Sequence, residues 1–226
     1  TGIFKNKNLI LILMESVNNI AINEELFPNI YKLYNEGISF ENNYSPRNNC
    51  STGNNELTVL TSLYSINNTC TANSYKRNIY PQSLLNHFNN NNYETSSYHD
   101  YVEFYYSRRT IYPNLGSKIY RNASDLGIKW SGLYEEWPSD VDLIEKSVPY
   151  FIDENNFMAY LVTVTTHQPY GKNSEYGNKH LEELSDYNYN IQLKRYLSKM
   201  TELDTALGLL VDKLEKQNKL DDTVIV

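Results

Sequence analysis

Residues 8–15 read NLILILME, an apolar run that begins at Asn8 and ends at the carboxylate of Glu15. A short, continuous apolar run is typical of a strand that is buried on both faces of a parallel sheet. It is far shorter than the roughly 20 apolar residues that a membrane-spanning helix needs. The stretch 157–165, FMAYLVTVT, has the same character, and residues 222–226 begin a third strand that we expect to be buried.

Helical patterns separate these strands. The clearest is 192–217, where Leu203, Leu207, Leu210 and Leu214 follow the spacing of one buried helix face. The polar Asp204 in this stretch is expected to cap or pair internally. We also expect helices at 29–36, 53–63, 81–88, 103–112 and from Ser139 to about 153, strands at 38–40, 93–98 and 117–120, and loops at 42–50 and 67–78. Strands that alternate with helices predict an α/β fold with a mostly parallel sheet flanked by helices. No internal repeat or linker divides residues 1–226, so we expect one domain.

The composition narrows the classes of partner. The chain carries a net charge of −7, and its Lys and Arg residues are scattered. They do not interleave with aromatic residues as in a nucleic-acid groove, so no nucleic acid is expected as a partner. We attribute the many Asn and Tyr residues to AT-rich coding. The two cysteines, Cys50 and Cys70, could pair in an oxidising compartment or remain free thiols, and the sequence leaves both open.

Polar side chains follow three predicted strands: Glu15 after the first, His99 after 93–98 and His167 after 157–165. Ligands of open parallel sheets bind beyond the carboxyl ends of the strands, so we expect these side chains at one edge. Residues 50–56, CSTGNNE, place Thr52 at the start of a predicted helix. Free N–H groups and a partial positive charge there favour a bound phosphate.

Taken alone, that segment is better explained by Thr52 as an ordinary N-cap. Glu15, His99 and His167, which follow the predicted strands, favour a catalytic role for Thr52 instead. A Thr hydroxyl becomes a useful nucleophile when a metal or base takes its proton, and Glu15 can help to hold such a metal. The combination predicts phosphoryl transfer through a covalent phospho-threonine.

Several of these stretches together resemble the extracellular catalytic domain of lipoteichoic acid synthases and related phosphoglycerol transferases. This family belongs to the alkaline phosphatase and sulfatase superfamily. The resemblance runs through essentially the whole chain, in residues 8–16 (NLILILMES), 27–44, 50–56, 98–109 (YHDYVEFYYSRR), 162–170 (VTVTTHQPY) and 196–226. It implies the N-terminal portion of that catalytic domain. We therefore expect the family's Asp-His metal ligands just beyond Val226, and a chain that is inactive without them.

The resemblance also implies roles for individual residues. Thr52 corresponds to the catalytic nucleophile, and Glu15 with Thr52 would bind Mn²⁺ or Mg²⁺. The implied substrate-binding residues are His99, Tyr106, Arg108 and His167. The implied reaction moves glycerol phosphate from the phosphatidylglycerol headgroup to a glycerol-phosphate polymer or glycan acceptor. The implied place is the extracellular face of the membrane of a Gram-positive type of bacterium, with a membrane anchor outside this sequence.

The chain departs from the family pattern at several positions. The family's Ser-Asp after the nucleophile is Gly53-Asn54, its usual Trp is Tyr106, and Tyr101 stands where an Asp can occur. An alternative for Arg108 is an ion pair with Glu103 or Asp100, while the adjacent Arg109 should face elsewhere. Trp130 and Trp137 are expected to pack the core or flank the site.

Three other functions stay open. A sulfatase would need Cys-x-Pro-x-Arg, and the residues after Cys50 include neither the Pro nor the Arg. A phosphoethanolamine transferase shares the Thr nucleophile but usually has more disulfides. A non-catalytic domain that binds a glycerol phosphate polymer is the third alternative.

Overall fold

The computed structural model describes residues 2–40, 42–45, 49–66 and 69–226. These residues form a parallel five-stranded sheet with the strand order β3-β2-β4-β1-β5. The strands are β1 (Asn8–Leu13), β2 (Glu94–His99), β3 (Ile119–Arg121), β4 (Phe157–Val162) and β5 (Thr223–Ile225). The predicted α/β class and the mostly parallel sheet are therefore confirmed.

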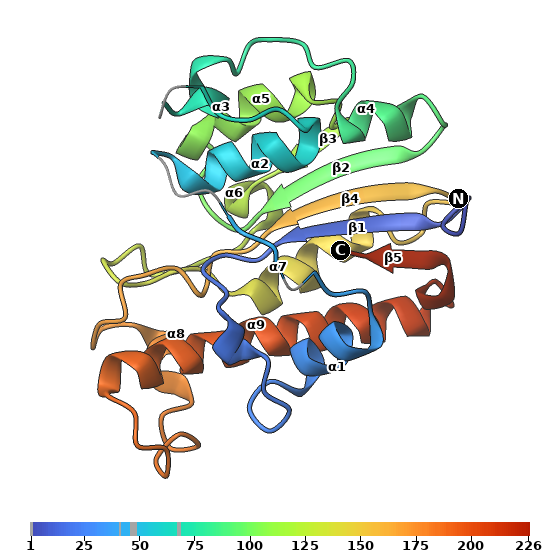
Figure 1. Cartoon of the computed structure of the whole chain (residues 1–226). Coiled ribbons are helices and arrows are strands. Elements are labelled where there is room, and N and C mark those ends of the chain that lie inside the picture. Colours follow the sequence, from blue (N-terminus) through green and yellow to red (C-terminus); the bar gives the residue numbers. More distant parts are fainter. Residues whose placement is uncertain (1, 41, 46–48, 67–68) are drawn as a thin grey trace.

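Helices cover both faces of the sheet (Figure 1). They are α1 (Pro28–Glu36), α2 (Ser51–Thr61), α3 (Thr71–Ser74), α4 (Leu84–Asn89), α5 (Arg108–Asn114), α6 (Ala123–Leu126), α7 (Asp140–Ser147), α8 (Glu175–Lys179) and α9 (Ile191–Lys216). Short 3₁₀ turns lie at Asn19–Ala21, Tyr105–Ser107, Val148–Tyr150 and Leu220–Asp222. The layers α2, α4 and α5 lie on one side of the sheet, and α7 and α9 on the other, with α1 packed on α9.

The apolar runs explain these layers. Successive side chains of a strand point to opposite faces of the sheet. Leu11 and Tyr160 accordingly pack with the α2, α4 and α5 side, whereas Ile10 and Leu161 pack with α7 and α9. A strand with apolar residues on both faces needs a helix layer on each side, which gives this three-layer domain.

The first and last turns of the helices follow from local sequence. Pro28 opens α1 and Gly37 follows its end, which is the usual asymmetry of helix termini. Asp204 of α9 reaches the start of α1, where its Oδ1 accepts a bond from Ile30 N at 2.8 Å and its Oδ2 one from Asn29 Nδ2 at 2.8 Å. The expected internal capping role of Asp204 is confirmed.

Other predicted elements are wrong or shorter. Residues 38–40 form no strand, and Ile38 and Phe40 are 79% and 78% exposed. The predicted helix 103–112 is interrupted because Tyr106 and Ser107 adopt left-handed backbone angles.

Strand β5 is only half-buried, because it pairs with β1 at the edge of the sheet. The helix capped by Ser139 ends at Ser147, and the predicted loop 67–78 contains α3. Residues 46–48 and 67–68 of the two predicted loops lie outside the described residues.

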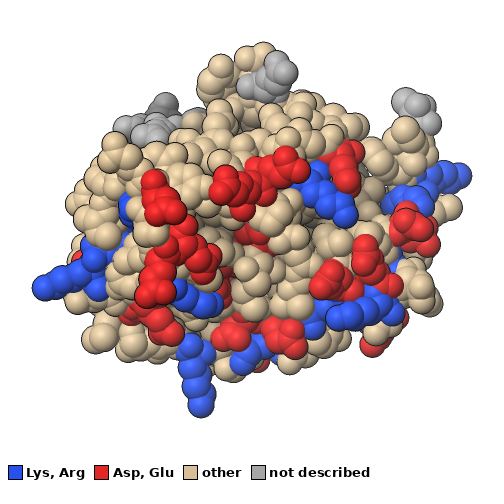
Figure 2. Space-filling view, turned by 90° about the horizontal axis from the view of Figure 1, so that it is seen from below, with Lys and Arg blue, Asp and Glu red and all other residues tan. Residues whose placement is uncertain are grey.

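The surface carries charges of both signs. Figure 2 shows acidic and basic side chains interspersed over the face that is seen from below. Within the described ranges, no helix combines the length and the apolar character needed to cross a lipid bilayer.

Candidate active site

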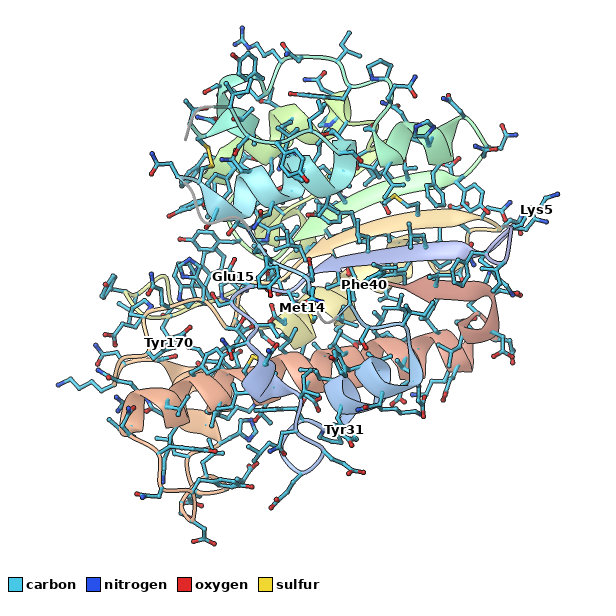
Figure 3. The ribbon with its side chains drawn as sticks, viewed as in Figure 1. Lys5, Met14, Glu15, Tyr31, Phe40 and Tyr170 are labelled. Atoms are coloured by element: carbon cyan, nitrogen blue, oxygen red, sulfur yellow. A yellow bond between two sulfur atoms is a disulfide. The ribbon has the colours of Figure 1, made fainter. Side chains whose placement is uncertain are left out.

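The carboxyl ends of β1, β2 and β4 meet at one edge of the sheet. Leu13 and His99 both pair with Val162, so the residues that follow these strands are neighbours. Glu15 lies just beyond the end of β1, in the space between the two helix layers (Figure 3). This is the edge at which open parallel sheets bind ligands.

Thr52 is the second residue of α2. The N-cap of this helix is Cys50, which has left-handed angles of φ 63° and ψ 45° and makes no side-chain capping bond. Thr52 Oγ1 instead donates a hydrogen bond to Glu15 Oε2 at 3.1 Å. The interpretation of Thr52 as an ordinary N-cap is therefore wrong. Its hydroxyl lies in the first turn of a helix, beside a carboxylate.

The backbone of Glu15 is fixed by the segment that follows β4. Glu15 N donates to Thr163 Oγ1 at 2.9 Å, and the Glu15 carbonyl accepts a bond from Thr166 Oγ1. Ser16 Oγ donates to Glu15 Oε1 at 2.7 Å, which leaves Oε2 for Thr52. Two threonines in the 162–170 motif thus place the carboxylate, a role that the sequence analysis did not assign to them.

All the predicted site residues line one small pocket of about 30 Å³, namely Glu15, Thr52, His99, Tyr106, Arg108 and His167. A larger cleft of about 910 Å³ shares Glu15, Thr52, Tyr106 and His167 with it. The structure therefore brings together residues that are spread over most of the chain. Their individual roles remain predictions.

His99 is buried at the end of β2. Its Nδ1 lies 2.9 Å from the carbonyl oxygen of Val162. A carbonyl only accepts, so the Nδ1 atom carries the proton of the neutral ring and Nε2 is left as an acceptor. Burial, together with the positive charge of Arg108, holds the pKa of His99 well below its usual value. A neutral His99 suits a ligand hydroxyl better than a phosphate oxygen.

Arg108 is only 2% exposed and is bound to Glu56. Its Nη2 donates to Glu56 Oε1 at 2.5 Å and its Nε at 3.2 Å, and Tyr112 donates to the other carboxylate oxygen. Burial alone would lower the pKa of Arg108, but the charge of Glu56 outweighs it and the pKa stands above its ordinary value. The predicted alternative pairing with Glu103 or Asp100 is wrong.

Glu56, the partner of Arg108, is a residue to which the sequence analysis assigned no role. Its position four residues after Thr52 places both on the same face of α2, which was the available signal. Arg109, in contrast, pairs with Glu103 and Asp125 near the surface, so it faces away from the pocket as expected.

Tyr106 sits in a left-handed conformation with φ 53°, followed by Ser107 with φ 54°. Its ring lies over the guanidinium of Arg108, whose Cζ is 5.2 Å from the ring centroid. Two consecutive non-glycine residues in this region are strained, and such strain often gathers at functional sites. The strained turn ends the 3₁₀ segment and lets the Tyr106 ring reach the pocket.

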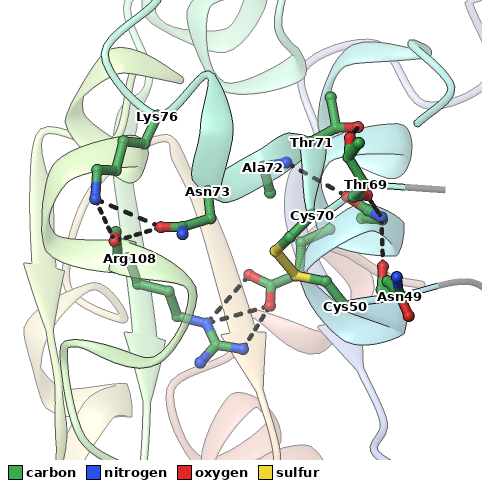
Figure 4. Close-up of a disulfide and its surroundings, with 12 residues drawn as sticks. Asn49, Cys50, Thr69, Cys70, Thr71, Ala72, Asn73, Lys76 and Arg108 are labelled. Carbon is green, nitrogen blue, oxygen red and sulfur yellow. Dashed lines mark hydrogen bonds and ion pairs between the residues drawn. A yellow bond between two sulfur atoms is a disulfide. The ribbon is translucent and has the colours of Figure 1, made fainter. Parts of the chain in front are cut away.

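A disulfide joins Cys50 to Cys70, with the two Cα atoms 5.0 Å apart. It links the start of α2 to the start of α3, as Figure 4 shows. From α3, Asn73 Oδ1 accepts a bond from Ser107 Oγ at 2.7 Å, and Ser107 Oγ accepts one from Lys76 Nζ at 2.9 Å. The crosslink therefore ties the helix that carries Thr52 to the turn that carries Tyr106.

Lys199 of α9 is a second residue that the sequence analysis missed. It is 1% exposed, and its Nζ donates to the carbonyls of His167 at 3.0 Å and Pro169 at 3.3 Å. Burial lowers its pKa to about 8. Lys199 holds the segment that carries His167. Its position in a helical stripe of apolar residues gave no sign of this function.

The residues present fit part of a metal site. Glu15 and Thr52 offer neighbouring oxygen atoms, the ligand type that hard divalent cations prefer. Within the described residues, no cluster of three or more His, Cys, Asp or Glu side chains could hold a metal ion. These two residues can thus supply only part of a coordination shell.

Fold and pocket together define a domain of the alkaline phosphatase and sulfatase type. The chain belongs to the Sulfatase family, whose model matches residues 7–226. The resemblance to this superfamily that the sequence indicated is therefore confirmed.

Two groups of known proteins are similar to the chain. The lipoteichoic acid synthase of Staphylococcus saprophyticus subsp. saprophyticus is 25% identical over 100% of this chain and 36% of its own length. The lipoteichoic acid synthase LtaP of Listeria monocytogenes has a TM-score of 0.79 and 22% identity over 99% of this chain and 56% of that protein. The phosphoglycerol transferase GacH of Streptococcus pyogenes, solved with sn-glycerol-1-phosphate, has a TM-score of 0.64 and 19% identity over 96% of this chain and 59% of that protein. The chain thus spans about a third of the length of the curated relative, at 36%, and little more than half of the solved structures.

Proposed function

We propose that the chain is the nucleophile-bearing part of a metal-dependent phosphoglycerol transferase. The enzyme would move glycerol phosphate from phosphatidylglycerol to a cell-envelope polymer or glycan. The observation that carries this proposal is the 3.1 Å hydrogen bond from Thr52 Oγ1 to Glu15 Oε2, at the start of a helix. The names of the similar proteins, lipoteichoic acid synthase and phosphoglycerol transferase, support the same class of reaction.

In the proposed first half-reaction, Thr52 Oγ attacks the phosphorus of the headgroup. A P–Oγ bond forms while the P–O bond to diacylglycerol breaks. The hydroxyl proton would move along the existing hydrogen bond to Glu15. The diacylglycerol oxygen would depart with the bonding electrons and take a proton from His167, which the proton on Glu15 would replace. The first turn of α2 stabilises the charge on the phosphate oxygens.

Arg108, Tyr106 and His99 would hold the headgroup. The Glu56 carboxylate fixes the guanidinium of Arg108, so a phosphate would meet a preorganised cation. The Nε2 atom of His99 would accept a hydrogen bond from a glycerol hydroxyl. In the second half-reaction, a hydroxyl oxygen of the acceptor attacks the same phosphorus and forms a P–O bond while the P–Oγ bond to Thr52 breaks. Thr52 Oγ takes up the proton that the acceptor hydroxyl loses.

Glu15 and Thr52 would hold Mn²⁺ or Mg²⁺, which when bound lowers the pKa of a ligating hydroxyl and screens phosphate charge. Hard divalent cations take about six ligands. We propose that the others come from substrate, water and parts of the catalytic domain outside this sequence. We also propose that the intact enzyme works at the extracellular face of a membrane to which another segment anchors it.

A donor-cleavage assay tests this function in a protein that carries the complete catalytic domain. Thr52→Ala should reduce release of diacylglycerol from phosphatidylglycerol by more than about a thousandfold, because the nucleophile is lost. Thr61→Ala is the matched control, since Thr61 lies at the other end of α2, where its hydroxyl donates to the Leu57 carbonyl and accepts from Leu63 N. Turnover that survives Thr52→Ala would contradict the proposed function.

Two further measurements separate the rival functions. Phosphatidylethanolamine and an aryl sulfate, offered as donors, test for a phosphoethanolamine transferase and for a sulfatase. Calorimetric titration with Mn²⁺, with and without Glu15→Ala, tests the metal site. A complete domain that binds no Mn²⁺ and cleaves no donor would instead indicate a non-catalytic polymer-binding domain.

A further inference from the structure

Two buried aspartates, Asp100 and Asp140, adjoin the residues that build the pocket. Asp100 follows His99 at the end of β2, and Asp140 is the first residue of α7. Both are 0% exposed, and their carboxyl groups lie within hydrogen-bonding reach of each other. The proposed reaction gives neither of them a role.

Asp140 anchors the segment that follows β4. Its Oδ1 atom accepts hydrogen bonds from Val164 N at 2.8 Å and from Thr165 N at 3.2 Å. Its own backbone N–H donates to Thr165 Oγ1 at 2.8 Å. Residues 164 and 165 are thus fixed to the start of α7.

The same segment holds Glu15 through the residues on either side. Glu15 N donates to Thr163 Oγ1, and Thr166 Oγ1 donates to the Glu15 carbonyl. Asp140 therefore anchors the inner two residues of a four-residue segment whose outer two place Glu15. A shift of Asp140 should move the Glu15 carboxylate relative to Thr52.

Three of the four carboxyl oxygens of the two aspartates lack a donor. Among the described residues, no group of another residue donates a hydrogen bond to Asp140 Oδ2 or to either oxygen of Asp100. His99 Nδ1 lies 3.5 Å from Asp100 Oδ1, but its proton is directed at the Val162 carbonyl oxygen at 2.9 Å. Buried polar atoms are costly when they have no partner, so the two carboxyl groups need a hydrogen between them.

A single proton meets this need. Two ionised carboxylates can only accept, so they cannot bond to each other, and like charges that are buried side by side repel. The two backbone N–H groups that bind Asp140 Oδ1 favour the ionised form of Asp140. Burial and the charge of Asp140 raise the pKa of Asp100 well above its ordinary value. The proton therefore belongs on Asp100.

The other charged groups near the two aspartates are already paired. Arg108 of α5 is bound to Glu56, and it lowers the pKa of Asp100 less than burial raises it. Glu202 of α9, which accepts a bond from the N-cap residue of α7, pairs with Lys179. The end of β4 contributes Val and Thr residues, which carry no charge.

We propose that Asp100 is a neutral carboxylic acid that donates a hydrogen bond to Asp140 Oδ2, and that the two form a positioning element of the site. We call these two residues the carboxyl pair. The pair braces the segment that holds Glu15, and its proton keeps a second negative charge away from His99. This inference goes beyond the proposed function, because the pair belongs to the fold whatever reaction the site performs.

The link to His99 has a chemical consequence. A negative charge on Asp100, 3.5 Å from His99 Nδ1, would favour the doubly protonated ring of His99. Nε2 would then carry a hydrogen and could no longer accept a bond from a ligand hydroxyl. A proton on Asp100 leaves the ring neutral and Nε2 an acceptor.

Urea unfolding of this chain at several pH values tests the proton. From about pH 5 to about pH 8, an aspartate of the unfolded chain is ionised, whereas Asp100 of the folded chain keeps its proton. The folded state then binds more protons, so stability should fall as pH rises. In the isosteric variant Asp100→Asn, the amide donates to Asp140 without a titrating proton. Relative to this variant, the folded-to-unfolded ratio of the wild type should fall by up to about tenfold per pH unit.

Asp142→Asn is the matched control, because it removes a partly exposed carboxylate from the same helix. It should leave the pH dependence of the wild type unchanged. Infrared spectra near pH 6 give a second readout that needs no unfolding. The wild type and Asp142→Asn should show the C=O band of a buried carboxylic acid, and Asp100→Asn should lack it. A difference from Asp100→Asn that does not change with pH, or a wild type without this band, would overturn the proposal.

The ring of His99, followed by nuclear magnetic resonance, tests the positioning role, since a merely structural aspartate would not affect its titration. Asp140→Asn keeps an oxygen for the two backbone N–H groups but offers an amide donor to Asp100, which should let Asp100 ionise. The pKa of His99 should then rise relative to the wild type and to Asp142→Asn. An unchanged titration of His99 would show that Asp100 does not control its charge, and would overturn the positioning role.

Donor cleavage by a protein with the complete catalytic domain tests the brace on Glu15, and this measurement alone rests on the proposed function. Asp100→Leu, which removes the donor to Asp140, should lower kcat by about tenfold or more, and Asp100→Asn should restore it. Equal kcat values for the two variants would reject the brace. The unfolding, infrared and resonance measurements need no donor, acceptor or metal, so they can fail while the Thr52→Ala test succeeds, and the reverse.

Discussion

A Cβ atom added to Gly53 would lie 2.8 Å from Cγ of Tyr106, so the aromatic ring rests directly on the first turn of α2. Gly53 follows Thr52, and the close approach explains why this chain has no side chain at a position where the family resemblance implies Ser. The pair couples α2, the helix that carries Thr52, to the strained turn at Tyr106 and Ser107.

Gly53→Ala should therefore destabilise the fold. An alanine in a helix is favoured over glycine by about 1 kcal/mol, but overpacking against the Tyr106 ring costs about 1–3 kcal/mol. Urea unfolding should show a net loss. In a Tyr106→Ala background the same change should cost much less, since the two closest contacts are gone and Cys50 Sγ, 3.1 Å from the added Cβ atom, is the one that remains of the three nearest. A loss of equal size in both backgrounds would show that the two residues are not coupled.

Breaking the buried ion pair of Glu56 and Arg108 should lower the free energy of unfolding far more than breaking the exposed pair of Glu103 and Arg109. Glu56→Gln leaves a buried guanidinium without its counter-charge, which typically costs about 3–5 kcal/mol of unfolding free energy. Glu103→Gln is the matched control, because the Glu103 and Arg109 side chains are both 47% exposed and such pairs contribute at most about 1 kcal/mol. Equal losses for the two variants would contradict the buried pairing.

Lys199 should make stability depend on pH. Burial lowers its pKa to about 8 in the folded chain, whereas the ordinary value is 10.5. Between these two values the unfolded chain binds more protons than the folded chain, so the free energy of unfolding should rise with pH across that window. Below pH 8 the contribution should be constant, because the lysine is protonated in both states.

The measurement compares the wild type with Lys199→Met by urea unfolding at several pH values. The stability of the wild type relative to the variant should increase from about pH 8 to about pH 10. Tyrosine ionisation affects both proteins and cancels in the difference. A difference that does not change with pH would show that Lys199 is not desolvated in the fold.

The disulfide between Cys50 and Cys70 should stabilise the fold. Cys50 and Cys70 are 20 residues apart, and crosslinks that close loops of this size typically contribute about 2–4 kcal/mol. The double variant Cys50→Ser with Cys70→Ser should lose that amount. Reductant should lower the stability of the wild type equally and leave the variant unaffected. If reductant leaves the wild type unchanged, the thiols are not joined.

Much of the fold was accessible from the sequence because its signals are local. The apolar runs 8–14 and 157–165 and the stripe of α9 needed only periodicity, and the strand-end rule then grouped Glu15, His99 and His167. The predicted strand at 38–40 was wrong because an apolar-polar alternation of three residues carries little information without a neighbouring strand.

The rest depends on contacts between distant residues. The partner of Arg108 lies 52 residues away on another helix, so no spacing rule could select Glu56 over Glu103 or Asp100. The break in the predicted helix 103–112 arises where Tyr106 and Ser107 turn toward α2 and α3, which overrides local helix propensity. Nothing local in the sequence marks Lys199, because the His167 and Pro169 carbonyls that it binds lie 32 and 30 residues away.

The seam between β1 and β4 has a consequence for the opening motions of the molecule. The bond that Glu15 N donates to Thr163 spans 148 residues, and the bond that the Glu15 carbonyl accepts from Thr166 spans 151. The bond between His99 and the Val162 carbonyl spans 63. Contacts of such long range form late in folding and are lost together when strands separate. Fluctuations that part β1 from β4 would therefore remove the Glu15 carboxylate from Thr52 and displace the His167 segment in one step. Hydrogen exchange of the Glu15 and Thr163 backbone amides should then proceed at a single common rate, the rate at which β1 separates from β4.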